Sequence, residues 1–70
     1  MKLSARNQIK GTVTKITEGA VNNEVVLEIA PGVELTSVIT KQSAQSLGLK
    51  EGGTAYAVVK ASNVMVGVDE

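Results

Sequence analysis

Apolar and polar residues alternate along much of this chain, which is the pattern of strands that turn one face toward a core. The alternation is cleanest over residues 24–30, where every second position is apolar. The dipeptide Pro31-Gly32 follows, and Pro before Gly is typical of the central positions of a type II turn. A hairpin is therefore predicted, with its return strand over residues 33–39.

The first strand is predicted to be irregular. Val13 lies on one face of a strand over residues 9–16, whereas Ile16 lies on the other face. A β-bulge near Thr14-Lys15 would restore the phase, because a bulge adds one residue to one of two paired strands. Two further strands are predicted over residues 54–60 and 64–68.

The hydrophobic period changes between the third and fourth predicted strands. Thr40 is an N-cap residue type, Ala44 and Leu47 lie on one helical face, and Gly48 stands where a helix ends. A short helix is therefore predicted over residues 40–47. Three strands, a helix and two strands are the layout of an OB-like five-stranded barrel, so the expected fold class is mainly β. An SH3-like barrel fits the strands but explains the helix less well.

The length of 70 residues allows one domain, residues 1–70, with a small core. No Cys is present to form a disulfide, so association of copies is the remaining common way to stabilise such a chain. Apolar residues on both faces of the predicted strands favour a homo-oligomer, although scattered surface valines are also normal. The valines concerned are Val26, Val38, Val58, Val64, Val66 and Val68.

Composition excludes several classes of function. The chain has no His and no Cys, so it lacks the commonest general base, thiol nucleophile and transition-metal ligands, and no enzymatic activity is expected. A single aromatic residue and a net charge of zero argue against a nucleic-acid partner. No apolar run is long enough for a signal peptide or a membrane span, so no membrane partner and a cytoplasmic location are expected.

Three short polar groups carry hydrogen-bond donors in a pattern typical of an anion site. Two are near-mirror tripeptides that join a cation to a hydroxyl across an alanine, and the third opens the predicted helix, where backbone N–H groups are unpaired. If the groups converge, they form a donor-only cage for a tetrahedral dianion, which favours molybdate, tungstate or sulfate over phosphate. The residues are Ser4, Ala5, Arg6, Lys60, Ala61, Ser62, Thr40 and Ser43.

The spacing of these groups does not establish that they meet. Each has a simpler interpretation: Thr40 as a helix cap, Arg6 as a solvated residue near the start, and Lys60 as a strand-end lysine. The carboxylates Glu24 and Glu28 share one strand face, which is interpreted as a solvated edge rather than an acid–base or metal site.

Several sequence blocks resemble the molbindin or molybdenum-pterin-binding (Mop) family, whose domain is also called TOBE. The resemblance covers essentially the whole chain. The blocks are Ser4-Ala5-Arg6-Asn7-Gln8, Gly11, Ile39-Thr40-x-x-Ser43, Leu47-Gly48-Leu49 with Glu51-Gly52, and Val58-Val59-Lys60-Ala61-Ser62-x-Val64-Met65-Val66.

The resemblance implies an OB-like fold that assembles into a hexamer, a trimer of dimers, and binds molybdate or tungstate at subunit interfaces. It implies that the residues matching Thr40 and Ser43 come from a neighbouring subunit, opposite those matching the two tripeptides. It also implies a role in intracellular molybdenum storage and homeostasis. No organic cofactor is expected, because the single Tyr56 offers little surface for stacking a pterin.

A second anion site near the threefold axis of the hexamer is also implied. The loop before the second predicted strand is the candidate, since successive backbone N–H groups can form an anion-binding nest. Its residues are Lys15, Gly19, Ala20, Val21 and Asn22. The alternative function for the chain is an OB-fold structural module, or a single-strand nucleic-acid module, with no specific oxyanion ligand.

Overall fold

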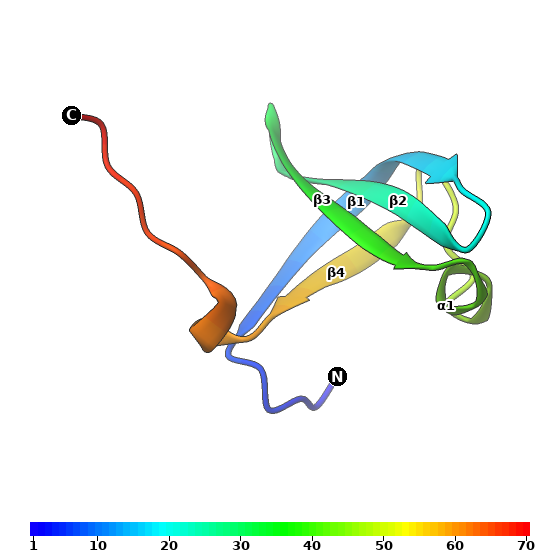
Figure 1. Ribbon diagram of the computed structural model, residues 1–70, viewed down its shortest axis with the longest axis horizontal. Coiled ribbons are helices and arrows are strands. Elements are labelled where there is room, and N and C mark those ends of the chain that lie inside the picture. The colour runs from blue at the N-terminus through cyan, green and yellow to red at the C-terminus, as the bar shows by residue number, and fades with distance from the viewer.

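The computed structural model describes all 70 residues as a curled antiparallel sheet, a short helix and an extended C-terminal segment (Figure 1). The sheet has four strands in the order β3-β2-β1-β4, and each neighbouring pair is antiparallel. The predicted mainly-β fold, with one helix between the third and fourth strands, is confirmed. The elements are β1 (Asn7–Glu18), β2 (Asn22–Ala30), β3 (Val33–Thr40), α1 (Lys41–Ser46), β4 (Thr54–Val59) and the short 3-10 helix η1 (Ala61–Asn63).

The predicted hairpin and bulge are both present. Ala30 of β2 pairs with Val33 of β3 across a turn in which Gly32 has a φ of 75°, a conformation that favours glycine. The pairing of β1 with β2 shifts register between Val13 and Lys15. The shift disrupts the ladder locally, and the backbone N–H of Ile16 donates instead to Oε2 of Glu51 at 3.1 Å.

Helix α1 is bounded as the sequence predicts. The hydroxyl oxygen of Thr40 accepts a hydrogen bond from the backbone N–H of Ser43 at 3.0 Å, which is the bond of an N-cap. At the other end Gly48 has a φ of 63°, and the N–H of Leu49 donates to the carbonyl of Ala44 at 3.2 Å. The two ends of the helix are thus fixed by hydrogen bonds between residues three to five positions apart. No helix of the chain has the length and hydrophobicity needed to cross a membrane.

The core is small. Val13, Val25 and Leu27 form its buried centre, and only five of the 70 residues are buried. One of the five is Asn23, whose side-chain Oδ1 has no hydrogen-bond partner. A chain with so little buried surface gains little stability from its own packing. The partly buried residues around the centre are Ile16, Ile29, Ile39, Leu49, Ala55 and Ala57.

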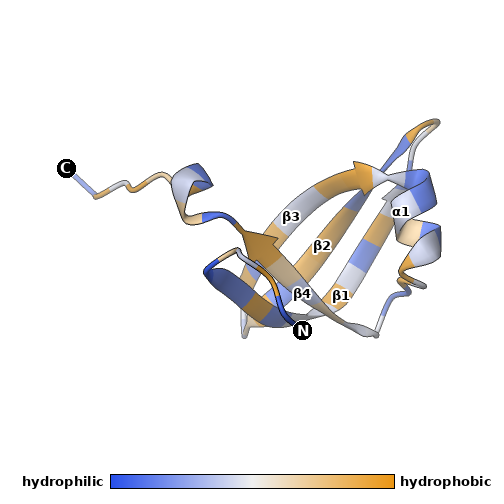
Figure 2. Cartoon of the chain, turned by 90° about the horizontal axis from the view of Figure 1, so that it is seen from below, coloured by the Kyte–Doolittle hydropathy of each residue, from blue (hydrophilic) through white to orange (hydrophobic).

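The predicted fifth strand does not form within the single chain. After η1, residues 64–70 run away from the sheet without pairing (Figure 1). These residues, here named the C-terminal segment, are exposed, and Figure 2 shows hydrophobic residues along them. The exposed fractions of Met65, Val66 and Val68 are 94%, 90% and 89%. The prediction of a five-stranded barrel from one chain is therefore wrong by one strand, because alternation specifies a strand but not the chain with which it pairs.

Candidate anion-binding site

The two tripeptides leave the sheet at the same end. Asn7 is the first residue of β1 and pairs with Val59, the last residue of β4. The side-chain Nδ2 of Asn7 also donates to the carbonyl of Val59 at 3.2 Å, which fixes this end of the ladder. Residues 4–6 precede Asn7 and residues 60–62 follow Val59, so the antiparallel register brings Arg6 and Lys60 to neighbouring positions. We call this region the β1–β4 end.

Beyond the pairing of Asn7 with Val59, the backbone at the β1–β4 end makes few hydrogen bonds, and these are local. The N–H of Asn63 donates to the carbonyl of Lys60 at 2.9 Å, and that of Val64 donates to the carbonyl of Ala61 at 3.3 Å. On the other strand, Nε2 of Gln8 donates to the carbonyl of Ala5 at 3.1 Å. In these three bonds the tripeptides only accept, through the carbonyls of Lys60, Ala61 and Ala5. The bonds therefore use none of the hydrogen-bond donors of either tripeptide.

The side chains at the β1–β4 end are directed to solvent rather than into the fold. Ser4, Arg6, Lys60 and Ser62 are exposed, and Ala5 is half-buried. The two tripeptides thus carry two cations and two hydroxyls on the chain segments that adjoin one end of the β1–β4 ladder, with no carboxylate within either tripeptide. This composition provides hydrogen-bond donors and positive charge but no acceptor side chain other than hydroxyl oxygens.

Thr40 and Ser43 lie at the opposite end of β1. Thr40 ends β3 and pairs with Asn22, and β2 begins beside Glu18, the last residue of β1. Figure 1 accordingly shows α1 at the far end of the sheet from η1. A single chain thus brings the two tripeptides together but leaves the third polar group apart.

The capping interpretation of Thr40 is confirmed, yet it leaves one hydroxyl proton free. Oγ1 of Thr40 accepts from the N–H of Ser43 and donates to Oγ of Ser43 at 2.7 Å. Ser43 accepts that bond with its oxygen, so its own O–H remains available to donate outward. Ser43 is exposed, so this proton can reach a ligand or a neighbouring molecule.

Four of the five residues predicted for a second anion site, residues 19–22, lie at the connection between β1 and β2. The N–H of Gly19 is used within the turn, where it donates to the carbonyl of Asn22 at 2.9 Å. The carbonyls of Gly19 and Val21 accept from the Nζ and backbone N–H of Lys41, at 3.5 and 2.8 Å. Ala20 is exposed, and Lys15 lies on β1 opposite Val26 rather than in the turn. The turn therefore offers fewer free N–H groups than a continuous nest.

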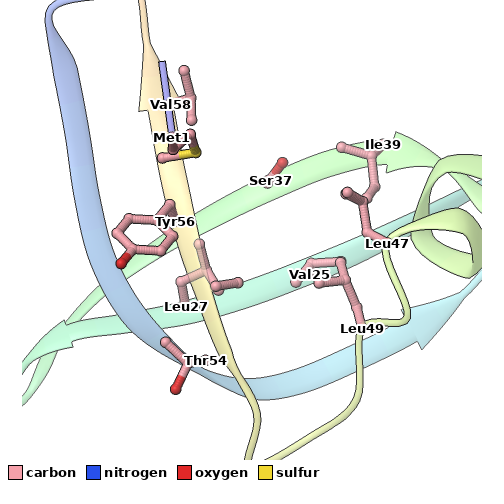
Figure 3. Close-up of a pocket in the computed structure, with 11 residues that line it drawn as sticks. Met1, Val25, Leu27, Ser37, Ile39, Leu47, Leu49, Thr54, Tyr56 and Val58 are labelled. Carbon is pink, nitrogen blue, oxygen red and sulfur yellow. The ribbon is translucent and has the colours of Figure 1, made fainter. Parts of the chain in front are cut away.

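An apolar groove lies between β3 and β4, which are the two edge strands of the sheet (Figure 3). Its volume is about 350 Å³, and nine of its 11 lining residues are hydrophobic. Tyr56 and Val58 line it although they are 48% and 45% exposed. This groove was not predicted from the sequence, although apolar residues on both faces of the fourth strand were a signal of it.

Comparisons with known proteins agree on one family. The TOBE domain model matches residues 3–66. The chain is 52% identical over 66 residues to molybdenum-pterin-binding protein 2 of Clostridium pasteurianum, covering 94% of this chain and 97% of that protein.

Solved structures of similar proteins share the fold. A molybdate-binding protein from Sporomusa ovata superposes with a TM-score of 0.90 at 37% identity, covering 97% of this chain and all of that one. The cytoplasmic molybdate-binding protein ModG, solved with molybdate bound, superposes with a TM-score of 0.92 at 54% identity. That match covers 99% of this chain and 49% of ModG.

Proposed function

This chain belongs to the TOBE domain family, and we propose that its residues 1–70 form one domain that binds molybdate or tungstate for molybdenum storage and homeostasis. The observation that carries the proposal is the β1–β4 end, where two cationic tripeptides leave neighbouring strands together. Relatives described as molybdate-binding or molybdenum-pterin-binding proteins support the choice of ligand.

The chemistry of the β1–β4 end suits a tetrahedral dianion. Arg6 and Lys60 supply charge-assisted hydrogen bonds, and the hydroxyls of Ser4 and Ser62 supply neutral ones. Each charge-assisted bond contributes about 1.5–3 kcal/mol, so a few of them suffice for tight binding after desolvation. Molybdate carries no proton at neutral pH and needs only donors, whereas monohydrogen phosphate also needs an acceptor. We therefore expect selectivity against phosphate.

The remaining donors are proposed to come from a second copy. Thr40 and Ser43 lie at the far end of β1 from Arg6 and Lys60, so one chain cannot close the cage with them. The free O–H of Ser43 points to a role in donating across an interface. A site shared between copies also agrees with the sequence-based expectation of a homo-oligomer, a hexamer built as a trimer of dimers.

The C-terminal segment is proposed to hold the copies together. It carries alternating valines that its own chain leaves exposed, and the groove between β3 and β4 is apolar and flanked by open strand edges. A strand from a second copy placed there would pair with an edge and bury its valines, which is strand addition to a sheet. The same insertion would supply the fifth strand of the barrel.

The finer features of this function follow the same reasoning. We propose action in the cytoplasm, as described for ModG, and no catalysis, since the chain has no His or Cys. No organic cofactor is proposed, because Tyr56 is the single aromatic residue and lines the apolar groove rather than the β1–β4 end. The turn at Gly19–Asn22, with Lys15, remains the candidate for an additional anion site on the symmetry axis.

Calorimetric titration of the anion-free protein with sodium molybdate tests the proposal. We expect saturable binding that persists in excess phosphate and in excess sulfate, with at least one ion per interface. Heat that millimolar sulfate abolishes would indicate a generic anion pocket, and absence of heat would contradict a role as a molybdate store. Binding of a single-stranded oligonucleotide in its place would favour the alternative module.

A further inference from the structure

Lys60, Ala61 and Ser62 form the connection between the sheet and the C-terminal segment. Every residue from Lys60 to the end of the chain is exposed. The only hydrogen bonds of η1 to neighbouring backbone are the two local ones, to the carbonyls of Lys60 and Ala61. Nothing in the body of the same chain therefore holds this half of the candidate site in one arrangement, apart from the end of β4.

The C-terminal segment begins only two residues after Ser62. Val64, Val66 and Val68 share one face of an extended chain, and the exposed fractions of these side chains are 51%, 90% and 89%. Two residues span at most about 7 Å, so fixing Val64 also confines Ser62 to a small volume. Wherever the segment docks, it determines the path of the connection.

We infer that docking of the C-terminal segment on a second copy is what arranges Lys60 and Ser62 for oxyanion binding, so that binding and association are coupled. This inference rests on the proposed function and adds a regulation to that same site. The coupling is distinct from the sharing of hydrogen-bond donors between copies. It acts on Lys60-Ala61-Ser62 of the same chain whose C-terminal segment docks. By linkage, it must work in both directions.

The coupling has two consequences. A bound oxyanion draws Lys60 toward Arg6 and fixes the connection, so it must slow the release of the segment from the second copy. Conversely, a chain in which the connection is lengthened must bind the oxyanion more weakly, even when all donor residues and the C-terminal segment are present. Coupling between two sites typically changes affinity by about 5- to 150-fold.

An insertion of Gly-Gly-Ser between Asn63 and Val64 tests the second consequence. The insertion leaves the segment free to dock but removes its hold on residues 60–62. We expect the variant to keep the oligomeric state of the wild type in sedimentation velocity and to bind molybdate about tenfold more weakly by calorimetry. The control is the same insertion between Pro31 and Gly32, at a hairpin turn where Gly32 has open space around it, and its affinity should be unchanged.

Subunit exchange tests the first consequence without any variant. Wild-type protein labelled with ¹⁵N is mixed with unlabelled protein, and mixed oligomers are followed by native mass spectrometry with and without molybdate. We expect molybdate to slow the exchange about tenfold. An exchange rate that molybdate does not change overturns the inference, as does wild-type affinity in an assembled insertion variant. If the Gly-Gly-Ser insertion prevents assembly, insertion of a single Gly at the same position replaces it, because slower exchange alone also follows from donors shared between copies. Failure of wild-type protein to bind molybdate would instead overturn the proposed function.

Discussion

The two ends of strand β1 are built in different ways. At the end near α1, the hydroxyl of Thr40 caps the helix, Gly48 ends it, and the backbone N–H of Lys41 donates to the carbonyl of Val21 at 2.8 Å. At the β1–β4 end, Arg6 and Lys60 are exposed and an apolar segment leaves the fold without a partner. The backbone at the end near α1 is hydrogen-bonded within a single chain, whereas the β1–β4 end carries exposed charge and apolar surface that have no partner in that chain.

This difference indicates which substitutions should affect folding and which should affect ligand binding. Substitutions of the groups that cap and end α1 should act first on folding, because their hydrogen bonds are already formed within the chain. Substitutions at the β1–β4 end should act first on ligand binding and association, because the groups there have few partners within the chain. Four predictions test this contrast, ordered by how strongly each change should weaken molybdate binding.

Removing either cation at the β1–β4 end should cause the largest loss of molybdate affinity. Arg6→Ala and Lys60→Ala each delete a charge-assisted donor, which should weaken binding about 10- to 100-fold by calorimetry. The control is Lys50→Ala, because Lys50 is an exposed cation in the connection between α1 and β4. Equal effects of Arg6→Ala and Lys50→Ala would mean that general electrostatic attraction, not a cage, binds the ion.

A charge on the C-terminal segment should disrupt association. Val66→Asp places a carboxylate on the face proposed to enter the groove of a second copy, and burying an unpaired charge costs several kcal/mol, on the order of the stability of a small interface. Sedimentation velocity should show smaller species than the wild type. Val33→Asp, at a half-exposed valine beside the hairpin turn, is the matched control and should keep the oligomer.

The hydroxyl of Ser43 should matter for binding but little for folding. Ser43→Ala removes the free O–H donor while keeping the backbone N–H that bonds to Thr40, so molybdate affinity should fall about fivefold, as for one neutral hydrogen bond. Thr40→Ala removes the cap itself and should lower the free energy of unfolding by about 1 kcal/mol. A Ser43→Ala variant with wild-type affinity would exclude this hydroxyl from the cage.

The smallest effect is expected at the buried carboxamide of Asn23. Its Oδ1 has no partner, and Asn23→Leu replaces an unsatisfied polar group with an apolar one beside a cavity of about 330 Å³. Thermal unfolding should show stabilisation of about 1 kcal/mol with molybdate affinity unchanged. Destabilisation would mean that the carboxamide acquires a hydrogen-bond donor when copies associate.

The features that were predictable from the sequence are those determined by near neighbours. The hairpin at Pro31-Gly32, the bulge before Lys15 and the cap at Thr40 all depend on residues within a few positions of each other. Residues 64–68 have the alternation of a strand, yet the partner of such a strand is a property of the assembly. Alternation therefore predicted the extended form of these residues and not their absence from the sheet.

For the candidate site too, the sequence predicted the local groups but not how distant groups are brought together. Spacing alone left open whether Ser4-Ala5-Arg6 meets Lys60-Ala61-Ser62; the pairing of Asn7 with Val59 brings them to one end of the sheet. No local sequence pattern determines the register between residues 52 positions apart, because that register depends on how β1 curls around the core. The apolar groove was likewise not predicted, since its lining combines residues of β2, β3 and β4 that only the curl of the sheet brings together.

In the proposed site, the β1–β4 end of one copy holds the ion together with residues of another copy. A crystal structure of the protein grown with tungstate, phased on the anomalous signal of tungsten, tests this most directly. We expect a tungsten peak within hydrogen-bonding reach of Arg6, Lys60 and Ser62 of one copy and of Ser43 of a second copy. A peak enclosed by residues of one chain, or one remote from Arg6 and Lys60, would contradict it.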